Sequence, residues 1–167
     1  MTVPLPMDTK IRPAEQRDYP AILEIYARAR RYMAETGNPN QWGENHPPVT
    51  AVQRDIAQHR SYVCVVCGAI EAVFMLQSGE DPTYAKIDGA WRSDAPYHTV
   101  HRIASSGRYS GIFDFCIQWC YSRVGHLRID THEDNRVMQH LILKNGFTRC
   151  GIIDQPDGSS RIAYEKL

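Results

Sequence analysis

The spacing of apolar residues predicts two helices near the start of the chain. Across residues 21–37 they recur every three or four positions, the period of an amphipathic helix, and a glycine closes the run. Asp18 is expected to cap this helix, which is entered through Pro20, because proline is tolerated in a first turn where its missing N–H is not needed. Thr50 is suited to cap a second, shorter helix that runs to about residue 60.

From residue 61 onward the pattern changes to β-rich runs with short connections. Residues 61–67 and 69–77 are two apolar runs split only by Gly68, which predicts a hairpin. The remaining expected elements are a short strand over residues 10–13, strands over 97–104 and 126–131, helices over 111–125 and 135–147, and a closing pair of strands over 148–153 and 161–167. This order predicts an α/β fold in which helices cover both faces of a mixed sheet.

The composition is that of an average globular chain, with 167 residues of which 43% are hydrophobic, and we expect a single domain over residues 1–167. Lys+Arg and Asp+Glu both number 19, and this zero net charge argues against a nucleic-acid partner. The sequence has no apolar run long enough for a membrane span and no signal-peptide pattern. Its five cysteines are an odd number, so we expect reduced thiols and a cytoplasmic protein that does not bind membranes.

A loop of small and polar residues, 105–111, joins a predicted strand to a predicted helix. The first turn of a helix exposes N–H groups without an intrahelical partner, and the helix dipole adds about half a positive charge there. Gly111 leaves room for a ligand near the backbone, and Arg108 adds a charged, fork-shaped donor. This arrangement is typical of phosphate sites. On these residues alone an ordinary strand–helix connection is the alternative, since glycine loops are common in turns.

The run from Arg108 to Ile112 resembles the Arg/Gln-x-x-Gly-x-Gly/Ala signature of the GNAT superfamily of acetyl-CoA-dependent N-acetyltransferases. Residues 128–147 resemble the strand and helix that follow in that family, including an asparagine and a closing Lys-x-Gly-Phe. The flanking elements match over residues 10–167. The resemblance implies a mixed, mostly antiparallel twisted sheet of about seven strands flanked by about four helices, with central parallel strands that splay apart.

The resemblance also implies an activity and a coenzyme site. The activity is transfer of an acetyl group from acetyl-CoA to a primary amine of a small molecule or peptide, by direct attack in a ternary complex and without a metal. Loop amides would bind the pyrophosphate, and the exposed backbone of residues 101–104 would pair with the pantetheine arm. The residues assigned to coenzyme binding are Arg102, Ile103, Ala104, Arg108, Tyr109, Ser110, Gly111, Ile112, Phe113, Asn135 and Lys144.

Two positions depart from the family pattern. The third signature position, usually Gly or Ala, is Phe113, whose ring either crowds the pyrophosphate or points into the core. Ile142 stands where the family usually has a tyrosine that protonates the departing thiolate. A coenzyme A thiolate is a fairly good leaving group, so catalysis is still expected. Ile142 nevertheless favours somewhat the alternative of a non-catalytic acetyl-CoA-binding module that regulates a partner.

His101 is the first candidate for the general base, because histidine titrates near neutral pH and family members often place a Glu or His base on this strand. Tyr97 shares its face of the strand and is the second candidate. A packed, hydrogen-bonded core histidine is the alternative for His101. On the next strand, we expect Asp130 to form an ion pair with a neighbour such as Arg102, or else to orient His101.

The loop after the first helix shapes the acceptor pocket in family members, and here it carries Gln41 and Trp42. A tryptophan there can stack on an acceptor or cover the cleft, and a packing role is the alternative. Cys64 and Cys67 are three positions apart in a strand, which places them on opposite faces, so we expect buried thiols rather than a metal site. Exposed strand edges in such a fold allow a homodimer.

Overall fold

The structure is a computed structural model that describes residues 1–167. Its helices are α1 (Tyr19–Glu35), α2 (Val49–Ala57), α3 (Ile112–Val124) and α4 (Arg136–Lys144), with short 3-10 helices η1 (Gln16–Asp18) and η2 (Pro82–Tyr84). Its strands are β1 (Val3–Pro4), β2 (Thr9–Pro13), β3 (Ser61–Val66), β4 (Ala69–Ser78), β5 (Asp88–Gly89), β6 (His98–Ser105), β7 (Tyr109–Ser110), β8 (Leu127–Thr131), β9 (Thr148–Asp154) and β10 (Ser160–Lys166).

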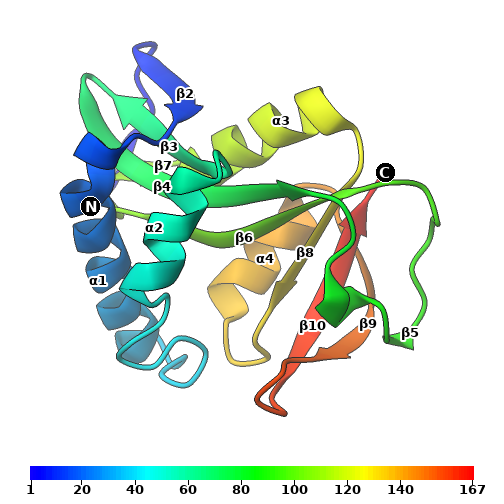
Figure 1. The fold of residues 1–167 in the computed structure, drawn as a ribbon. Helices are drawn as coiled ribbons and strands as arrows, with labels where there is room; N and C mark the ends of the chain where they lie inside the picture. Colours follow the sequence, from blue (N-terminus) through cyan, green and yellow to red (C-terminus); the bar gives the residue numbers. More distant parts are fainter.

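Eight strands form one twisted sheet in the order β2-β3-β4-β6-β8-β10-β9-β5 (Figure 1). Strand β1 pairs with β7 as a separate parallel ribbon. Within the large sheet every pair is antiparallel except β6 with β8. These two strands pair only at His98 with Leu127 and at Thr99 with Arg128. The predicted mixed, mostly antiparallel sheet with splayed central strands and four helices is therefore confirmed.

Of the two predicted helix caps, the position at Asp18 is confirmed and the one at Thr50 is wrong. Asp18 does occupy the N-cap of α1, but its carboxylate makes no capping bond and instead accepts two hydrogen bonds from Arg12, at 2.7 and 2.9 Å. Thr50 lies inside the first turn of α2, and Pro48 occupies the N-cap in an extended conformation. The Asp18 carboxylate does not cap α1 because it is bound by Arg12. Helix α2 begins after Pro48 because the fixed φ of proline suits the entry into a helix.

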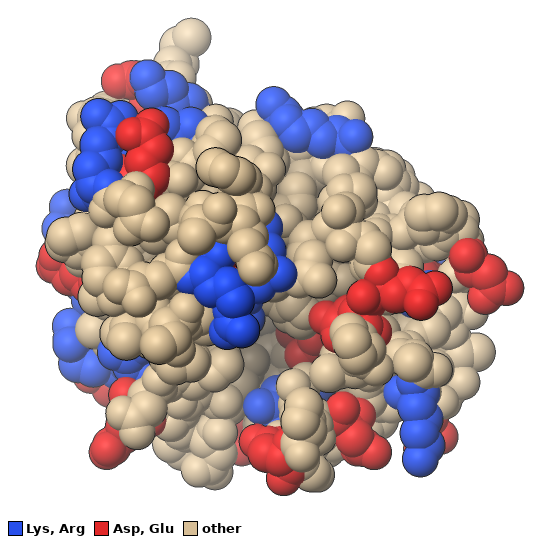
Figure 2. All heavy atoms as spheres, in the orientation of Figure 1, with Lys and Arg blue, Asp and Glu red and all other residues tan.

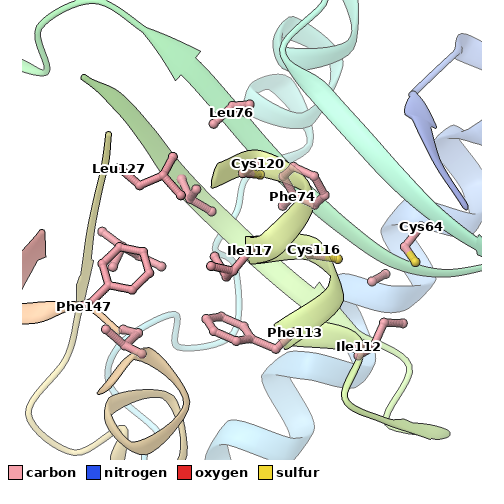
Figure 3. Close-up of a cluster of buried hydrophobic side chains, with 14 of the residues drawn as sticks. Cys64, Phe74, Leu76, Ile112, Phe113, Cys116, Ile117, Cys120, Leu127 and Phe147 are labelled. Carbon is pink, nitrogen blue, oxygen red and sulfur yellow. The ribbon is translucent and has the colours of Figure 1, made fainter. Parts of the chain in front are cut away.

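Helices cover both faces of the sheet, as predicted. On one face α3 and α4 pack against the central strands around a cluster of 17 buried residues, part of which is drawn in Figure 3. On the other face α1 and α2 pack over a cluster of 10 buried residues that includes Ile22, Ile56 and Val73. None of the helices combines the length and the apolar character that a membrane span requires.

Candidate active site

The parting of β6 and β8 opens a cavity of about 560 Å³ between the two halves of the sheet. Figure 2 shows this side of the molecule hollowed below its centre, with acidic side chains gathered near η2 and basic side chains beside α2. We call this cavity the acceptor cavity. The charged and titratable residues in its wall are His46, Asp81, His101, Arg102, Asp130, Asp157 and Arg161.

His101 lies in the wall of the acceptor cavity, on β6, between two carboxylates. Its Nε2 is 2.6 Å from Oδ2 of Asp81, and its Nδ1 is 3.9 Å from Oδ2 of Asp130. Asp81 is the N-cap of η2, where its carboxylate also accepts hydrogen bonds from the N–H and hydroxyl groups of Thr83. Sequence reasoning missed Asp81; the only local signal was an aspartate immediately before a proline, which is suited to start a turn.

The charge state of Asp81 determines which nitrogen of His101 carries a proton. Burial raises the pKa of Asp81, but hydrogen bonds from His101 and Thr83 outweigh that effect and lower the pKa to about 2. The carboxylate is therefore ionised at neutral pH and can only accept, so Nε2 must donate to it. In a neutral ring Nδ1 then has the free lone pair, and it faces the cavity side where Asp130 lies. His101 thus has the geometry of a general base that acts through Nδ1.

Tyr97 lies behind Asp81 rather than in the acceptor cavity. Its hydroxyl accepts a hydrogen bond of 2.8 Å from the N–H of Asp81, and its ring packs against the guanidinium of Arg128, 3.9 Å from the ring centroid. The side chain is buried and does not line the cavity. The structure therefore brings only the first catalytic candidate, His101, to the cavity and places the second where it holds Asp81.

The expected ion pair between Asp130 and Arg102 is wrong. Asp130 accepts a hydrogen bond of 2.7 Å from the hydroxyl of Tyr84, while Arg102 donates to Asp55 of α2 through Nε and Nη2, at 2.8 and 2.9 Å. The reason is a bulge in β6, where Arg102 has a left-handed φ of +51° and the register with β4 shifts. The carbonyl of Arg102 accepts from the Tyr26 hydroxyl, so this backbone group is already occupied.

Gln41 and Trp42 both line the acceptor cavity, from the loop after α1. The Trp42 ring packs edge-to-face on Tyr26, with centroids 5.6 Å apart, and lies 5.8 Å from the His46 ring. The side-chain oxygen of Gln41 accepts a hydrogen bond of 3.0 Å from Asn135 on the opposite half of the molecule. Trp42 therefore packs on the core and forms part of the cavity wall.

A second, more apolar cavity of about 330 Å³ runs along the C-terminal part of β6 toward the loop over residues 105–111, which we call the signature loop. We call this second cavity the coenzyme groove. The predicted coenzyme residues in its lining are Ile103, Ala104, Tyr109, Ile112, Phe113 and Asn135. The groove and the acceptor cavity share four lining residues, Met33, Ile103, Asn135 and Met138. The two cavities therefore meet where β6 and β8 part.

The start of α3 presents backbone donors that the helix itself does not use. The first intrahelical hydrogen bond of α3 runs from Phe115 N–H to the Gly111 carbonyl, so the N–H groups of Ile112, Phe113 and Asp114 have no partner within the helix. Gly111 has a φ of +78°, a conformation that glycine adopts without strain, and the space beside its α-carbon is open. Phe113 is buried and points into the core beside Ile117 and Phe147 (Figure 3), so its ring does not block the loop.

Three residues assigned to the coenzyme have side chains engaged elsewhere. Arg108 lies 3.3 Å from the buried carboxylate of Glu71, the Ser110 hydroxyl donates to the Val3 carbonyl, and Lys144 pairs with Asp114 at 2.8 Å. None of the three lines either cavity.

Helix α4 begins and ends as the motif requires. Asn135 is its N-cap, with Oδ1 accepting from the N–H of Met138 at 3.0 Å while Nδ2 donates to Gln41. Ile142 is fully buried in the large core cluster. Ile142, which stands where the GNAT pattern has a proton-donating tyrosine, therefore has a packing role in this chain.

The five cysteines are all free. Cys64 is buried in the core and Cys67 is exposed in the β3–β4 turn, so the pair does not converge. The structure contains no group of three or more His, Cys, Asp or Glu side chains arranged to hold a metal ion.

The proteins that resemble this chain were found among solved structures. No protein-family model matches the chain, and no curated protein matches it. A GNAT-family acetyltransferase from Streptococcus agalactiae 2603 is 30% identical, covers 96% of each chain and superposes with a TM-score of 0.88. A GNAT-family acetyltransferase from Listeria monocytogenes 4b F2365 is 19% identical over 95% of this chain and 94% of its own, with a TM-score of 0.70.

A third similar structure is that of yncA from Salmonella typhimurium, which was solved with its cofactor acetyl-CoA. It is 15% identical over 95% of this chain and 92% of its own, with a TM-score of 0.64. The full-length similarity to the Streptococcus protein settles the family: the chain belongs to the GNAT family of acetyltransferases.

Proposed function

We propose that the protein transfers an acetyl group from acetyl-CoA to a primary amine of a small molecule or peptide, by direct attack in a ternary complex. The observation that carries this proposal is the meeting of an apolar groove with a polar, charged cavity at the parting of β6 and β8. Two substrates that enter from the two cavities would touch at Ile103 and Asn135, which line both. The acetyl-CoA bound by the Salmonella protein supports the choice of donor.

The residues of the coenzyme groove fit coenzyme A. Three N–H groups at the start of α3 that have no intrahelical partner suit a diphosphate, because they add to the positive end of the helix dipole. The mostly apolar lining of the groove suits the pantetheine arm. Bound acetyl-CoA would supply an activated thioester at the junction of the two cavities.

The side chains of the acceptor cavity supply the proton chemistry. An acceptor amine held by Asp130 can lose a proton to Nδ1 of His101 as it attacks the thioester carbon. Asp81 then stabilises the imidazolium from the Nε2 side. Because Ile142 offers no proton, we propose that water protonates the departing thiolate and that the imidazolium then returns its proton to the hydroxide that remains.

The competing proposal is an acetyl-CoA-binding module without turnover. Thiol release from acetyl-CoA over a panel of primary amines, measured beside the thermal shift caused by coenzyme A, separates the two. An enzyme gives both signals. A thermal shift without turnover on any amine would favour the module, and the lack of a shift with either coenzyme form would reject both.

Replacing His101 tests its role as base. We expect His101→Gln to lower kcat about 10²- to 10⁴-fold, the range for loss of a positioned general base, and to leave the thermal shift with coenzyme A unchanged. His98→Gln is the matched control, since His98 lies on the same strand but outside both cavities. Unchanged turnover in His101→Gln would assign the base to another group.

We also propose that the protein is cytoplasmic and that its sheet edge allows a homodimer. The five free cysteines agree with a reducing compartment such as the cytoplasm. The sheet ends in β2 on one side, whose outer edge is unpaired, so a homodimer through that edge is compatible with the fold.

A further inference from the structure

One of the two arginines that line the acceptor cavity forms no ion pair within 4.0 Å. Of these two arginines, Arg102 is bound by both carboxylate oxygens of Asp55. Arg161 has no carboxylate within 4.0 Å. Its Nη1 donates to the Ser159 hydroxyl and the Ser160 carbonyl, and its Nη2 reaches the Gln41 carbonyl only at 3.5 Å.

Asp157, which also lines the cavity, accepts hydrogen bonds from within its own turn. Its Oδ1 accepts from the N–H of Ser159 at 2.9 Å and from the hydroxyl of Ser159 at 2.6 Å. Since Asp157 forms no ion pair with Arg161, the guanidinium keeps donor capacity for an anion.

The register of β8 and β10 gives the position of Arg161 relative to Asp130. Ala163 is paired with Asp130, and Arg161 lies two residues before Ala163 on the same strand. Asp130 and Arg161 are therefore diagonal neighbours on one face of the sheet, where Cβ atoms are typically about 7–8 Å apart. They line the same cavity without forming an ion pair, which leaves room for a small ligand between them.

We propose that the natural acceptor is a small amine that also carries a carboxylate, of the amino-acid class. Its carboxylate binds Arg161, and its amine lies between Asp130 and Nδ1 of His101. Arginine suits the first role because its planar fork matches a carboxylate. The inference rests on the proposed function, since it names the acceptor for that same site.

The test compares amines that differ only in the carboxylate. Glycine, β-alanine, 4-aminobutyrate and 6-aminohexanoate are assayed with acetyl-CoA beside their amides, and L-amino acids beside theirs. We expect the best acid to exceed its amide in kcat/KM by about 10- to 100-fold, the range for a hydrogen-bonded charge. Arg161→Gln should remove that advantage and change the amide less than about threefold, while Arg161→Lys should restore part of it.

Arg149→Gln is the matched control, because Arg149 is exposed on the neighbouring strand and lines neither cavity. Equal kcat/KM for acids and amides, or an unchanged preference in Arg161→Gln, would overturn the inference while leaving the acetyltransferase intact.

Calorimetric titration of the same acids into the coenzyme A complex provides a readout that does not need turnover. Binding of an acid but not of its amide, lost in Arg161→Gln, supports the recognition of the carboxylate by Arg161 independently of turnover. No binding of any acid would overturn it.

Discussion

A histidine that faces a carboxylate at each ring nitrogen has its orientation and its reactive atom set by those neighbours. At His101 the closer partner, Asp81 at 2.6 Å, fixes the donor nitrogen, and the more distant one, Asp130 at 3.9 Å, marks the side on which a substrate proton arrives. Tyr97 holds Asp81 through its backbone N–H, and Tyr84 holds Asp130 through a hydroxyl. The base is therefore supported by neutral phenols rather than by further charges.

Removal of the charge on Asp81 should impair this base. We expect Asp81→Asn to lower kcat/KM about 10- to 100-fold, a loss smaller than that of the base itself. The cause is that an ionised carboxylate no longer stabilises the imidazolium formed during the reaction. Initial rates at neutral pH measure the effect, with Asp94→Asn, an exposed residue outside the cavities, as control.

The same variant has a stability signature with a definite sign. The pKa of Asp81 falls from 3.8 to about 2 on folding, so its ionised form stabilises the folded protein above pH 4. That contribution, about 2 kcal/mol from the pKa difference, is lost as the pH falls from 3.8 toward 2. Urea unfolding should therefore separate Asp81→Asn from wild type at pH 7, and the difference should shrink progressively as the pH falls from 3.8 toward 2. A difference that grows in acid would contradict this account.

The residues that sequence reasoning predicted and missed differ in how they reach the site. His101 and Trp42 were predicted because the resemblance to the GNAT superfamily implies a base on this strand and an acceptor pocket shaped by the loop after the first helix. Asp81 was missed because it arrives from a turn 20 positions before His101, and no local pattern encodes that contact. Lys144 belongs to the family motif, yet its ammonium pairs with Asp114 outside the groove. Side-chain partners that depend on tertiary packing are beyond periodicity.

At the scale of elements, the bulge in β6 is a strained segment held by two neighbouring helices. Arg102 adopts a left-handed φ of +51°, which costs an L-residue about 1–2 kcal/mol. Asp55 of α2 binds its guanidinium, and Tyr26 of α1 binds its carbonyl. The helices on one face therefore determine the backbone path at the junction of the two cavities.

Breaking the bond from α2 should relax this bulge. We expect Asp55→Asn to lower the free energy of unfolding by about 3 kcal/mol, the lower end for removal of one partner of a buried ion pair, since Arg102 keeps some solvent contact. It should also lower kcat, because the backbone at Ile103 shifts relative to the thioester. Denaturant unfolding and steady-state rates measure the two effects.

Arg60→Gln is the comparison for this prediction. Arg60 is the other guanidinium bound to Asp55, at 2.9 Å, and it lines neither of the two cavities. Its loss should destabilise the protein while kcat stays near wild type. An equal fall in kcat in both variants would show that stability alone accounts for the effect.

The elements themselves were largely predictable, and their exceptions have local causes. The β3–β4 hairpin at Gly68 and the end of α3 at Gly125 follow from glycine and hydrophobic spacing. The bulge at Arg102 was not predictable, because a charged residue in a β-branched run has no local reason to adopt a positive φ. The two-residue strands β1, β5 and β7 are too short to leave a periodic signal.

The whole molecule is two half-sheets joined at their middle by little more than two residue pairs. Strands β2, β3, β4 and β6 form one half, and β8, β10, β9 and β5 form the other. Beyond Thr99 and Arg128 the halves part, and on the open side Gln41 and Asn135 form a hydrogen bond between them. A ligand that fills the groove therefore contacts both halves at once.

Coenzyme A binding should protect the open side of the molecule selectively. At 100 times its Kd the ligand should add about 2.7 kcal/mol to the free energy of unfolding. Amide hydrogen exchange should slow most over residues 103–105 and 112–114, where the groove lining and the free N–H groups lie, and least over residues 148–166. His101→Gln should show the same protection, because His101 lines only the acceptor cavity. Protection confined to residues 148–166, or stabilisation without slower exchange at 112–114, would mean that the diphosphate binds somewhere other than the start of α3.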